Sequence, residues 1–203
     1  ESEERFSKAF RTSPHPIGIT EVATGRCIEV NDACLDLFGF RREEVIGNTT
    51  LILGIWPNLE ERVRVIERLK AGQPVRNMEF ALKVKSGAVR YLLASADLAE
   101  LNGTLCIVTV ANDITDRKQA EEALRRSEER FAKAFQASPH PVVISELDSG
   151  LVVDANDAAC QLFAYRTEEV VGRTTQQIGL WPSTEARDRY LELLKRQGSV
   201  RNV

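Results

Sequence analysis

The chain has 203 residues and a net charge of −3, and 43% of its residues are hydrophobic, which is sufficient for a globular core. Charges of both signs are interspersed, without the basic stripe of a typical nucleic-acid-binding domain, and no run approaches the roughly 18 apolar residues of a membrane helix. We therefore expect these residues to be cytoplasmic and to contact neither nucleic acid nor a membrane, whether or not the full-length protein is membrane-anchored elsewhere.

The first elements expected along the chain are a helix and a β-hairpin. Residues 2–12 place apolar side chains at i, i+3 and i+4, which predicts a helix that Pro14 and Pro16 end. Residues 17–21 and 27–30 are apolar runs on either side of a Thr-Gly turn. They predict the two strands of a hairpin.

Several helices are expected next. Asn31 or Asp32 is placed to cap a helix over residues 32–38, because a short polar side chain can accept hydrogen bonds from the free N–H groups of the first turn. Residues 43–45 predict one further turn of helix. A longer helix is predicted over residues 58–71, where apolar residues share a face and a Gly and a Pro follow.

Three strands complete the first half of the chain. Residues 75–84, 89–98 and 104–111 alternate or form short apolar runs, and Asn102 and Gly103 predict a type I′ hairpin between the last two. The order of elements predicts an α+β fold, with a five-stranded antiparallel sheet and helices on one face. We expect the first hairpin to pair beside the final strand.

The second half of the chain repeats the first at an offset of 125 residues, as in Phe6 and Phe131. The register holds without an insertion from Ser2 against Ser127 to Asn77 against Asn202. This period is longer than the roughly 20–50 residues of solenoid repeats, so it indicates a tandem duplication of a whole domain.

The two copies differ in extent. The first copy continues past Asn77 into the predicted strands, whereas the second ends at Val203. We therefore predict a first domain at residues 1–114, a connector at 115–137 and a C-terminally truncated second domain at 138–203, all within a longer protein. The second copy would expose a sheet edge. We expect a neighbouring chain to complete or cover it, or the copy to be poorly ordered.

The connector is expected to be one continuous helix, because no Pro or Gly interrupts residues 114–137. Small and apolar residues recur along it at alternating steps of four and three, which forms a heptad-like stripe: Ala120, Leu124, Ser127, Phe131, Ala134 and Ser138. We hypothesise a parallel homodimer through the N-terminal and connector helices, in which the connector transmits a rotation or a register shift.

Two motifs resemble those of the PAS superfamily of sensor domains. Residues 31–47 resemble the pattern N-x-A … L-F-G-Y … E-E-V-I-G, which returns at residues 156–172 with Ala164 in place of the Gly. Residues 113–124 resemble the D-I-T-x-R-K-x-x-E-x-x-L connector that follows many bacterial PAS domains. The resemblance covers essentially the whole chain. It implies the PAS fold and a sensory or relay role in multidomain bacterial signalling proteins.

The resemblance also suggests an output, because tandem PAS arrays are joined to histidine kinase cores and to diguanylate cyclase or phosphodiesterase domains. We predict a sensor histidine kinase of a two-component phosphorelay. A cyclic-di-GMP enzyme and a ligand-free dimerisation spacer are the alternatives, and the spacer predicts a filled core. The chain shows no nucleophile–base pair, metal cluster or phosphate loop, so we expect it to be non-catalytic, with a C-terminal effector domain outside it.

The cofactor stays open. Heme-binding PAS domains usually use a His on the long helix, whereas His15 and His140 lie in Ser-Pro-His-Pro turns. Photosensory flavin-binding members carry a reactive Cys in the stretch that corresponds to residues 47–56, which has none. Heme and covalent flavin are therefore disfavoured, and a small organic ligand or none remains. The four cysteines do not keep their places between copies, which favours small core residues in a reducing compartment over disulfides or zinc.

Any ligand pocket is expected between the sheet and the helices. We predict that ten apolar residues line it as ligand-binding residues: Ile28, Leu35, Phe38, Leu53, Trp56, Phe80, Leu82, Tyr91, Leu93 and Ile107. No charged group is clearly placed to hold an anionic ligand. Arg76 recurs as Arg201, but we expect both to lie at solvated strand edges.

Overall fold

The computed structural model describes residues 2–201, with side chains from residue 7 onward. It divides into two compact units, Glu1–Glu122 and Ala123–Val203, which are described separately. Helix α5 (Thr115–Ala137) begins in the first unit and ends in the second. In this part of the chain, no helix combines the length and the apolar character needed to cross a membrane.

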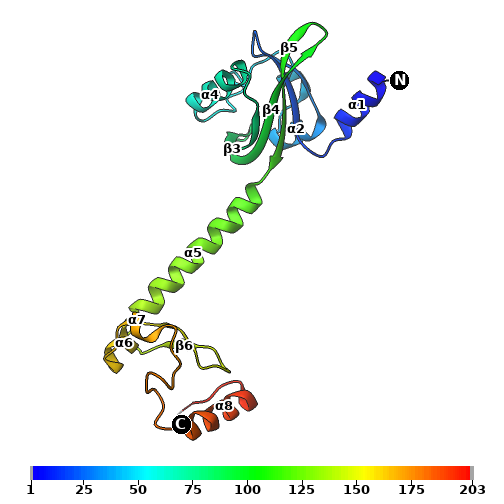
Figure 1. The fold of residues 1–203 in the computed structure, drawn as a ribbon. Coiled ribbons are helices and arrows are strands. Elements are labelled where there is room, and N and C mark those ends of the chain that lie inside the picture. The colour runs from blue at the N-terminus through cyan, green and yellow to red at the C-terminus, as the bar shows by residue number, and fades with distance from the viewer. Residues whose placement is uncertain (1, 202–203) are drawn as a thin grey trace. The chain divides into compact units, whose positions relative to one another are not determined.

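The first unit is built on a five-stranded antiparallel sheet, as predicted (Figure 1). Its strands are β1 (Ile17–Glu21), β2 (Cys27–Val30), β3 (Val75–Lys83), β4 (Val89–Leu101) and β5 (Thr104–Asp113), in the order β2-β1-β5-β4-β3. The hairpin therefore pairs with the final strand, as expected, with Ile17 opposite Val110. This pairing brings the two ends of the domain together at the centre of the sheet.

Strands β4 and β5 extend beyond the predicted ends, to Leu101 and Asp113, because they pair continuously from the turn between them. Asn102 and Gly103 have φ values of 50° and 76°, the two positive values that a type I′ turn requires. The turn residues thus set the register of the longest hairpin in the sheet.

Helices α2 (Asp32–Phe38), α3 (Arg42–Val45) and α4 (Leu59–Lys70) lie within one or two residues of their predicted bounds. With the loop before α4, they supply the side chains that pack on one face of the sheet, around Leu69, Phe80 and Leu92. Helix α1 (Ser2–Thr12) instead places Phe10 against Ile19 and Cys106, whose side chains belong to the opposite face.

Asn31 holds the corner where α1, β1 and α2 meet. Its side chain is fully buried, and its Oδ1 accepts hydrogen bonds from the N–H groups of Ile17 at 2.9 Å and Cys34 at 3.0 Å. Its Nδ2 donates to the carbonyl oxygens of His15 at 2.8 Å and Phe10 at 3.2 Å. The predicted cap is therefore confirmed, and the same side chain also ties the N-terminal helix to the sheet.

The second unit repeats the first part of this arrangement. Its elements after α5 are β6 (Val143–Ser145), β7 (Val152–Ala155), α6 (Asp157–Phe163), α7 (Thr167–Val170) and α8 (Thr184–Gln197). Asn156, like Asn31, is fully buried and bonds to five backbone groups, among them the carbonyl oxygen of Phe135 in α5 at 3.1 Å.

The sheet of the second unit has two strands, β6 and β7, within the described residues. Ile144 of β6 is therefore 38% exposed, whereas its counterpart Ile19 in the five-stranded sheet is 5% exposed. Completion of this edge by a neighbouring chain stays a prediction.

Candidate ligand cavity of the first unit

A cavity of about 640 Å³ lies between the sheet and helices α2 and α4 of the first unit. Its volume falls within the roughly 300–1,000 Å³ typical of small-molecule sites. Ala94 and Ala111 of the sheet line the cavity, and Ala96 lies in the adjoining core. Their short side chains leave room between the sheet and the larger groups on the helices.

Seven of the ten residues predicted to bind a ligand are brought together in the walls of this cavity: Leu35, Phe38, Leu53, Trp56, Phe80, Leu82 and Ile107. Trp56 meets Phe80 edge to face, with ring centroids 5.6 Å apart. That these seven bind a ligand stays a prediction.

The placement of Ile28, Tyr91 and Leu93 in the lining was wrong. Tyr91 and Ile28 are 40% and 43% exposed, and Leu93 shares the outward face of β4 with Tyr91. The residue that faces the cavity from this part of β4 is Leu92, which is 1% exposed. The alternation along β4 was identified correctly, but the face with the larger side chains was taken for the inner one.

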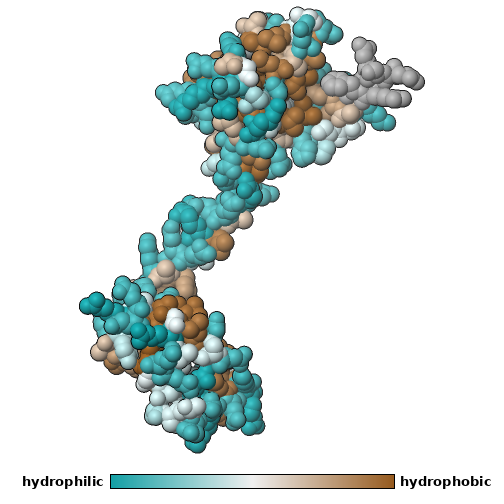
Figure 2. Space-filling model, viewed as in Figure 1, coloured by the Kyte–Doolittle hydropathy of each residue, from teal (hydrophilic) through white to brown (hydrophobic). Residues whose placement is uncertain are grey.

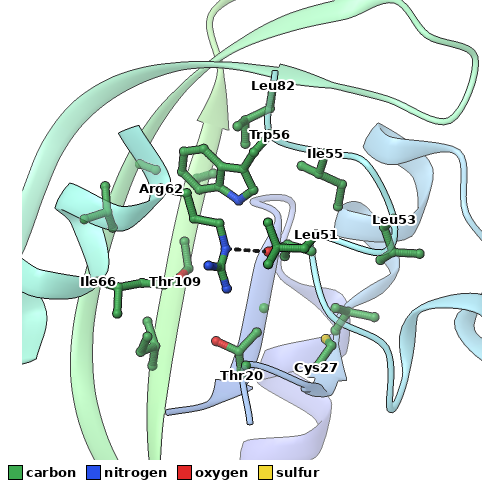
Figure 3. A pocket seen from close by; sticks show the side chains of 18 of the residues that line it. Thr20, Cys27, Leu51, Leu53, Ile55, Trp56, Arg62, Ile66, Leu82 and Thr109 are labelled. Atoms are coloured by element: carbon green, nitrogen blue, oxygen red, sulfur yellow. Dashed lines mark hydrogen bonds between the residues drawn. The ribbon is translucent and has the colours of Figure 1, made fainter. Parts of the chain in front are cut away.

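The cavity also contains a cation, Arg62 of α4, which sequence reasoning missed. Figure 3 shows its side chain reaching into the cavity, below Trp56 and toward Thr20. Its Nε donates a hydrogen bond to Oγ1 of Thr50 at 3.3 Å. Burial lowers the pKa of Arg62, although a guanidinium stays charged at neutral pH. The signal that could have found it is its recurrence as Arg187.

The guanidinium of Arg62 reaches the turn between β1 and β2. A Cβ added to Gly25 would lie 3.4 Å from its Nη2. Gly25 has a φ of 70°, so the turn favours glycine in both conformation and space. By contrast, Arg76, which the sequence singled out, pairs with Asp97 at 2.5 Å and does not line the cavity.

The cysteine thiols in the cavity wall are unreactive in character. Burial raises the pKa of Cys27 to about 11 and that of Cys34 to about 12; nearby Glu29 adds to the rise at Cys27 and Cys27 to that at Cys34. The thiolate, which is the nucleophilic and metal-binding form, is therefore scarce at neutral pH. His15 and His140 are exposed and lie outside the cavity lining. Within residues 7–201, no group of three or more His, Cys, Asp or Glu side chains is arranged to hold a metal ion.

The residues that hold the start of α5 lie on β3 and β4, two of the strands whose inner face forms the floor of the cavity. The Tyr91 N–H donates to Oγ1 of Thr115 at 3.0 Å, and the Ile114 N–H donates to the Tyr91 carbonyl at 2.9 Å. Glu79 of β3 pairs with Arg117 at 3.1 Å and with Lys118 at 2.6 Å. These contacts account for the Asp-Ile-Thr-x-Arg-Lys segment: its Thr binds β4, and its two basic residues bind β3.

Comparison with known protein families agrees with this architecture. The family model described as "PAS fold" matches residues 4–114, and a second, described as "PAS domain", matches residues 129–197. The chain belongs to the PAS family. The tandem arrangement of two PAS domains, expected from the 125-residue repeat, is thereby supported.

One curated relative of the PAS chain is the "Methyl sulfide methyltransferase-associated sensor" of Methanosarcina acetivorans. It is 29% identical over 134 residues, which cover 64% of the chain but 13% of the relative. The chain therefore spans a small part of the relative's length. The two PAS domains of this chain are sensory domains of the kind found in signalling proteins. The bacterial origin of the chain stays a prediction.

Two solved structures resemble this PAS chain. The PAS domain of a protein from Colwellia psychrerythraea is 19% identical, with a TM-score of 0.50, and the match covers 57% of this chain and 99% of that one. An RNA-binding Light-Oxygen-Voltage receptor is 15% identical, with a TM-score of 0.53, and the match covers 63% of this chain and 37% of that one. At these identities the likeness concerns the fold alone.

Proposed function

We propose that the chain is the sensory and relay module of a sensor histidine kinase, and that α5 carries the signal from the cavity of the first PAS domain to the second. Catalysis is assigned to an effector domain outside these residues. The cytoplasm is the proposed location, because all four cysteines are free, as in a reducing compartment. The observation that carries the proposal is the attachment of α5 to a PAS domain at each of its ends.

At its first end, α5 is attached to the back of the cavity floor. Phe80 and Leu92 face the cavity, and their neighbours Glu79 and Tyr91, on the other face of the same strands, hold the first turn of α5. Successive side chains of a strand point to opposite faces. A ligand that displaces β3 or β4 therefore moves the residues that position α5.

At its last end, α5 is attached to the core of the second domain. Phe135 is 7% exposed, and its carbonyl oxygen accepts a hydrogen bond from the buried side chain of Asn156. The same Asn156 accepts from the N–H groups of Val142, just before β6, and Ala159 in α6. A rotation of α5 would therefore act directly on the corner that orders the second domain.

The middle of α5 supports the proposed homodimer. Leu124 and Phe131, one heptad apart, are 61% and 60% exposed, and Ala120, Ser127 and Ala134 share their stripe. Figure 2 shows the helix as largely hydrophilic, with isolated hydrophobic patches. The stripe fits a second copy of the chain in register. Its small residues make the contact weak, which suits a helix pair that must switch between two packings.

Sedimentation equilibrium tests the dimer. We expect a dimer mass for the wild-type chain and a monomer mass for the double variant L124E and F131E, because two carboxylates cannot be buried in the seam. Lys133→Glu, off the stripe on the same helix, is the matched control and should stay dimeric. A wild-type monomer across the micromolar range would overturn the dimer.

Phosphorylation of the full-length protein tests the output. Incubation with radiolabelled ATP should give a phosphoryl group that is stable in base and labile in acid, as phosphohistidine is. Formation or hydrolysis of cyclic di-GMP instead would assign the module to the alternative class. The cavity argues against a ligand-free spacer, which predicts a filled core.

A further inference from the structure

The two PAS copies differ at one edge of the ligand cavity, where the first lacks an acidic residue that the second has. Asp148, in the turn between β6 and β7, accepts a hydrogen bond from Lys195 Nζ on its Oδ1 at 2.8 Å. Its carbonyl oxygen accepts from Nη2 of Arg187 at 3.2 Å. The counterpart of Asp148 in the first copy is Ala23. In the second copy, one aspartate thus engages two of the cations of α8, Lys195 through its carboxylate and Arg187 through its backbone carbonyl.

The same two cations are present in the first copy, as Arg62 and Lys70 of α4, and both line the cavity. Asp188, which lies 3.8 Å from Arg187, is also replaced there, by Val63. Across residues 7–201, neither Arg62 nor Lys70 has a carboxylate within ion-pair distance. A partly buried guanidinium without a counter-charge is costly, and an anion that reaches it recovers that cost.

Two other carboxylates in the cavity lining do not fill this role. Glu21 accepts a hydrogen bond from Thr24 within the β1–β2 turn, and Glu67 is exposed on α4. Both recur in the second copy, as Glu146 and Glu192. There, Arg187 and Lys195 form their hydrogen bonds with Asp148 instead. The difference between the copies therefore lies at Ala23 and Val63.

We propose that the first PAS domain binds a small organic monocarboxylate, with its carboxylate at Arg62 and Lys70 in the place that Asp148 takes in the second copy. The apolar body of the ligand lies among Trp56, Leu53 and Phe80, which form the hydrophobic part of the same cavity. The hydroxyl groups of Thr20 and Thr109, on neighbouring strands, provide further hydrogen-bonding groups. This inference rests on the proposed sensory function and names the ligand class for it.

Calorimetric titration of the whole chain with three probes of equal chain length tests the proposal. Octanoate, octanol and octylamine share an apolar body and differ in the charge of the head group. We expect octanoate to bind about tenfold or more tightly than octanol, which is the ratio that one charge-assisted hydrogen bond supplies. Octylamine should bind least, because it places a second cation beside Arg62 and Lys70.

A substitution taken from the second copy gives the sharpest variant. Ala23 is exposed, so Ala23→Asp should fold normally. Its carboxylate should pair with Lys70 and lie near Arg62, as that of Asp148 does with Lys195 and Arg187, and should remove the preference for octanoate over octanol. Ala23→Ser is the matched neutral control and should keep that preference. Arg62→Gln should reduce the preference for octanoate over octanol about tenfold or more. Thermal unfolding checks that this variant is folded.

Equal affinities for octanoate and octanol would overturn the proposal, as would an undiminished preference in Ala23→Asp or no binding of any probe. None of these results decides the relay function. The sedimentation and phosphorylation experiments need no carboxylate, so failure of the ligand class and failure of the proposed function are distinguishable.

Discussion

Replacement of Asn31 by alanine should destabilise the first PAS domain by about 3–7 kcal/mol. Loss of an N-cap costs about 1 kcal/mol. The substitution also removes the hydrogen bonds that Asn31 makes to the Ile17 N–H and to the carbonyl oxygens of Phe10, Ser13 and His15. Each unsatisfied buried group costs about 1–3 kcal/mol. Water can reach the exposed His15, so we count chiefly the Ile17 and Phe10 groups.

Urea unfolding followed by tryptophan fluorescence measures this loss. Each unit has one tryptophan, Trp56 or Trp181, so the Trp181→Phe background reports the first domain alone. Asn31→Asp separates the two roles of the side chain. It keeps the oxygen that caps α2 but sets a carboxylate against the carbonyl oxygens that the amide of Asn31 now binds.

The reasoning about Asn31 would be refuted by a loss near 1 kcal/mol for Asn31→Ala, because that is the cost of a simple helix cap. It would equally be refuted if Asn31→Asp had wild-type stability. Asn156→Ala should leave the Trp56 transition unchanged, which controls for effects of the second unit.

Three further predictions concern single contacts. Gly47→Ala should destabilise the first domain by about 1–2 kcal/mol, because its φ is 78° and its surroundings are open; unchanged urea unfolding would contradict this. A hydrogen bond from Lys85 and one from the Arg41 N–H lower the pKa of Glu44 to about 2. The stabilisation by ionised Glu44 is therefore present above about pH 4.5 and lost toward pH 2. The free energies of unfolding of wild type and Glu44→Gln should converge over that range, and a constant difference between them would contradict this prediction. Glu79→Ala should change stability little, because exposed ion pairs contribute little to it. It should nevertheless speed amide exchange in residues 115–122, and unchanged exchange would show that the Glu79 pairs do not hold α5.

The sequence predicted the fold well at positions where a residue type strongly favours one local structure. Asn31 and Asn156 cap helices because their amides suit that position, and Asn102 and Gly103 form the turn that only residues tolerant of positive φ adopt readily. The offset of 125 residues doubled the signal at Asn31, whereas the turn at Asn102 and Gly103 occurs once in the chain.

The lining of the cavity could be predicted only in part. Alternation shows which residues of β4 share a face, but not which face is buried, and here the inner face carries Leu92 and small alanines while Tyr91 and Leu93 point outward. Arg62 was missed because a charged residue on an amphipathic helix is usually solvated. Its position depends on the approach of α4 to the turn at Gly25, which no local pattern encodes.

Hydrogen–deuterium exchange at the start of α5 tests most directly whether the cavity of the first PAS domain is coupled to the connector. Ala94→Leu fills part of the cavity from β4, and Leu105→Met alters an exposed side chain of β5 that lies outside the lining. We expect Ala94→Leu to change the exchange of residues 115–122 and Leu105→Met to leave it unaltered. Changes confined to the cavity lining in Ala94→Leu would contradict the relay through Glu79 and Tyr91.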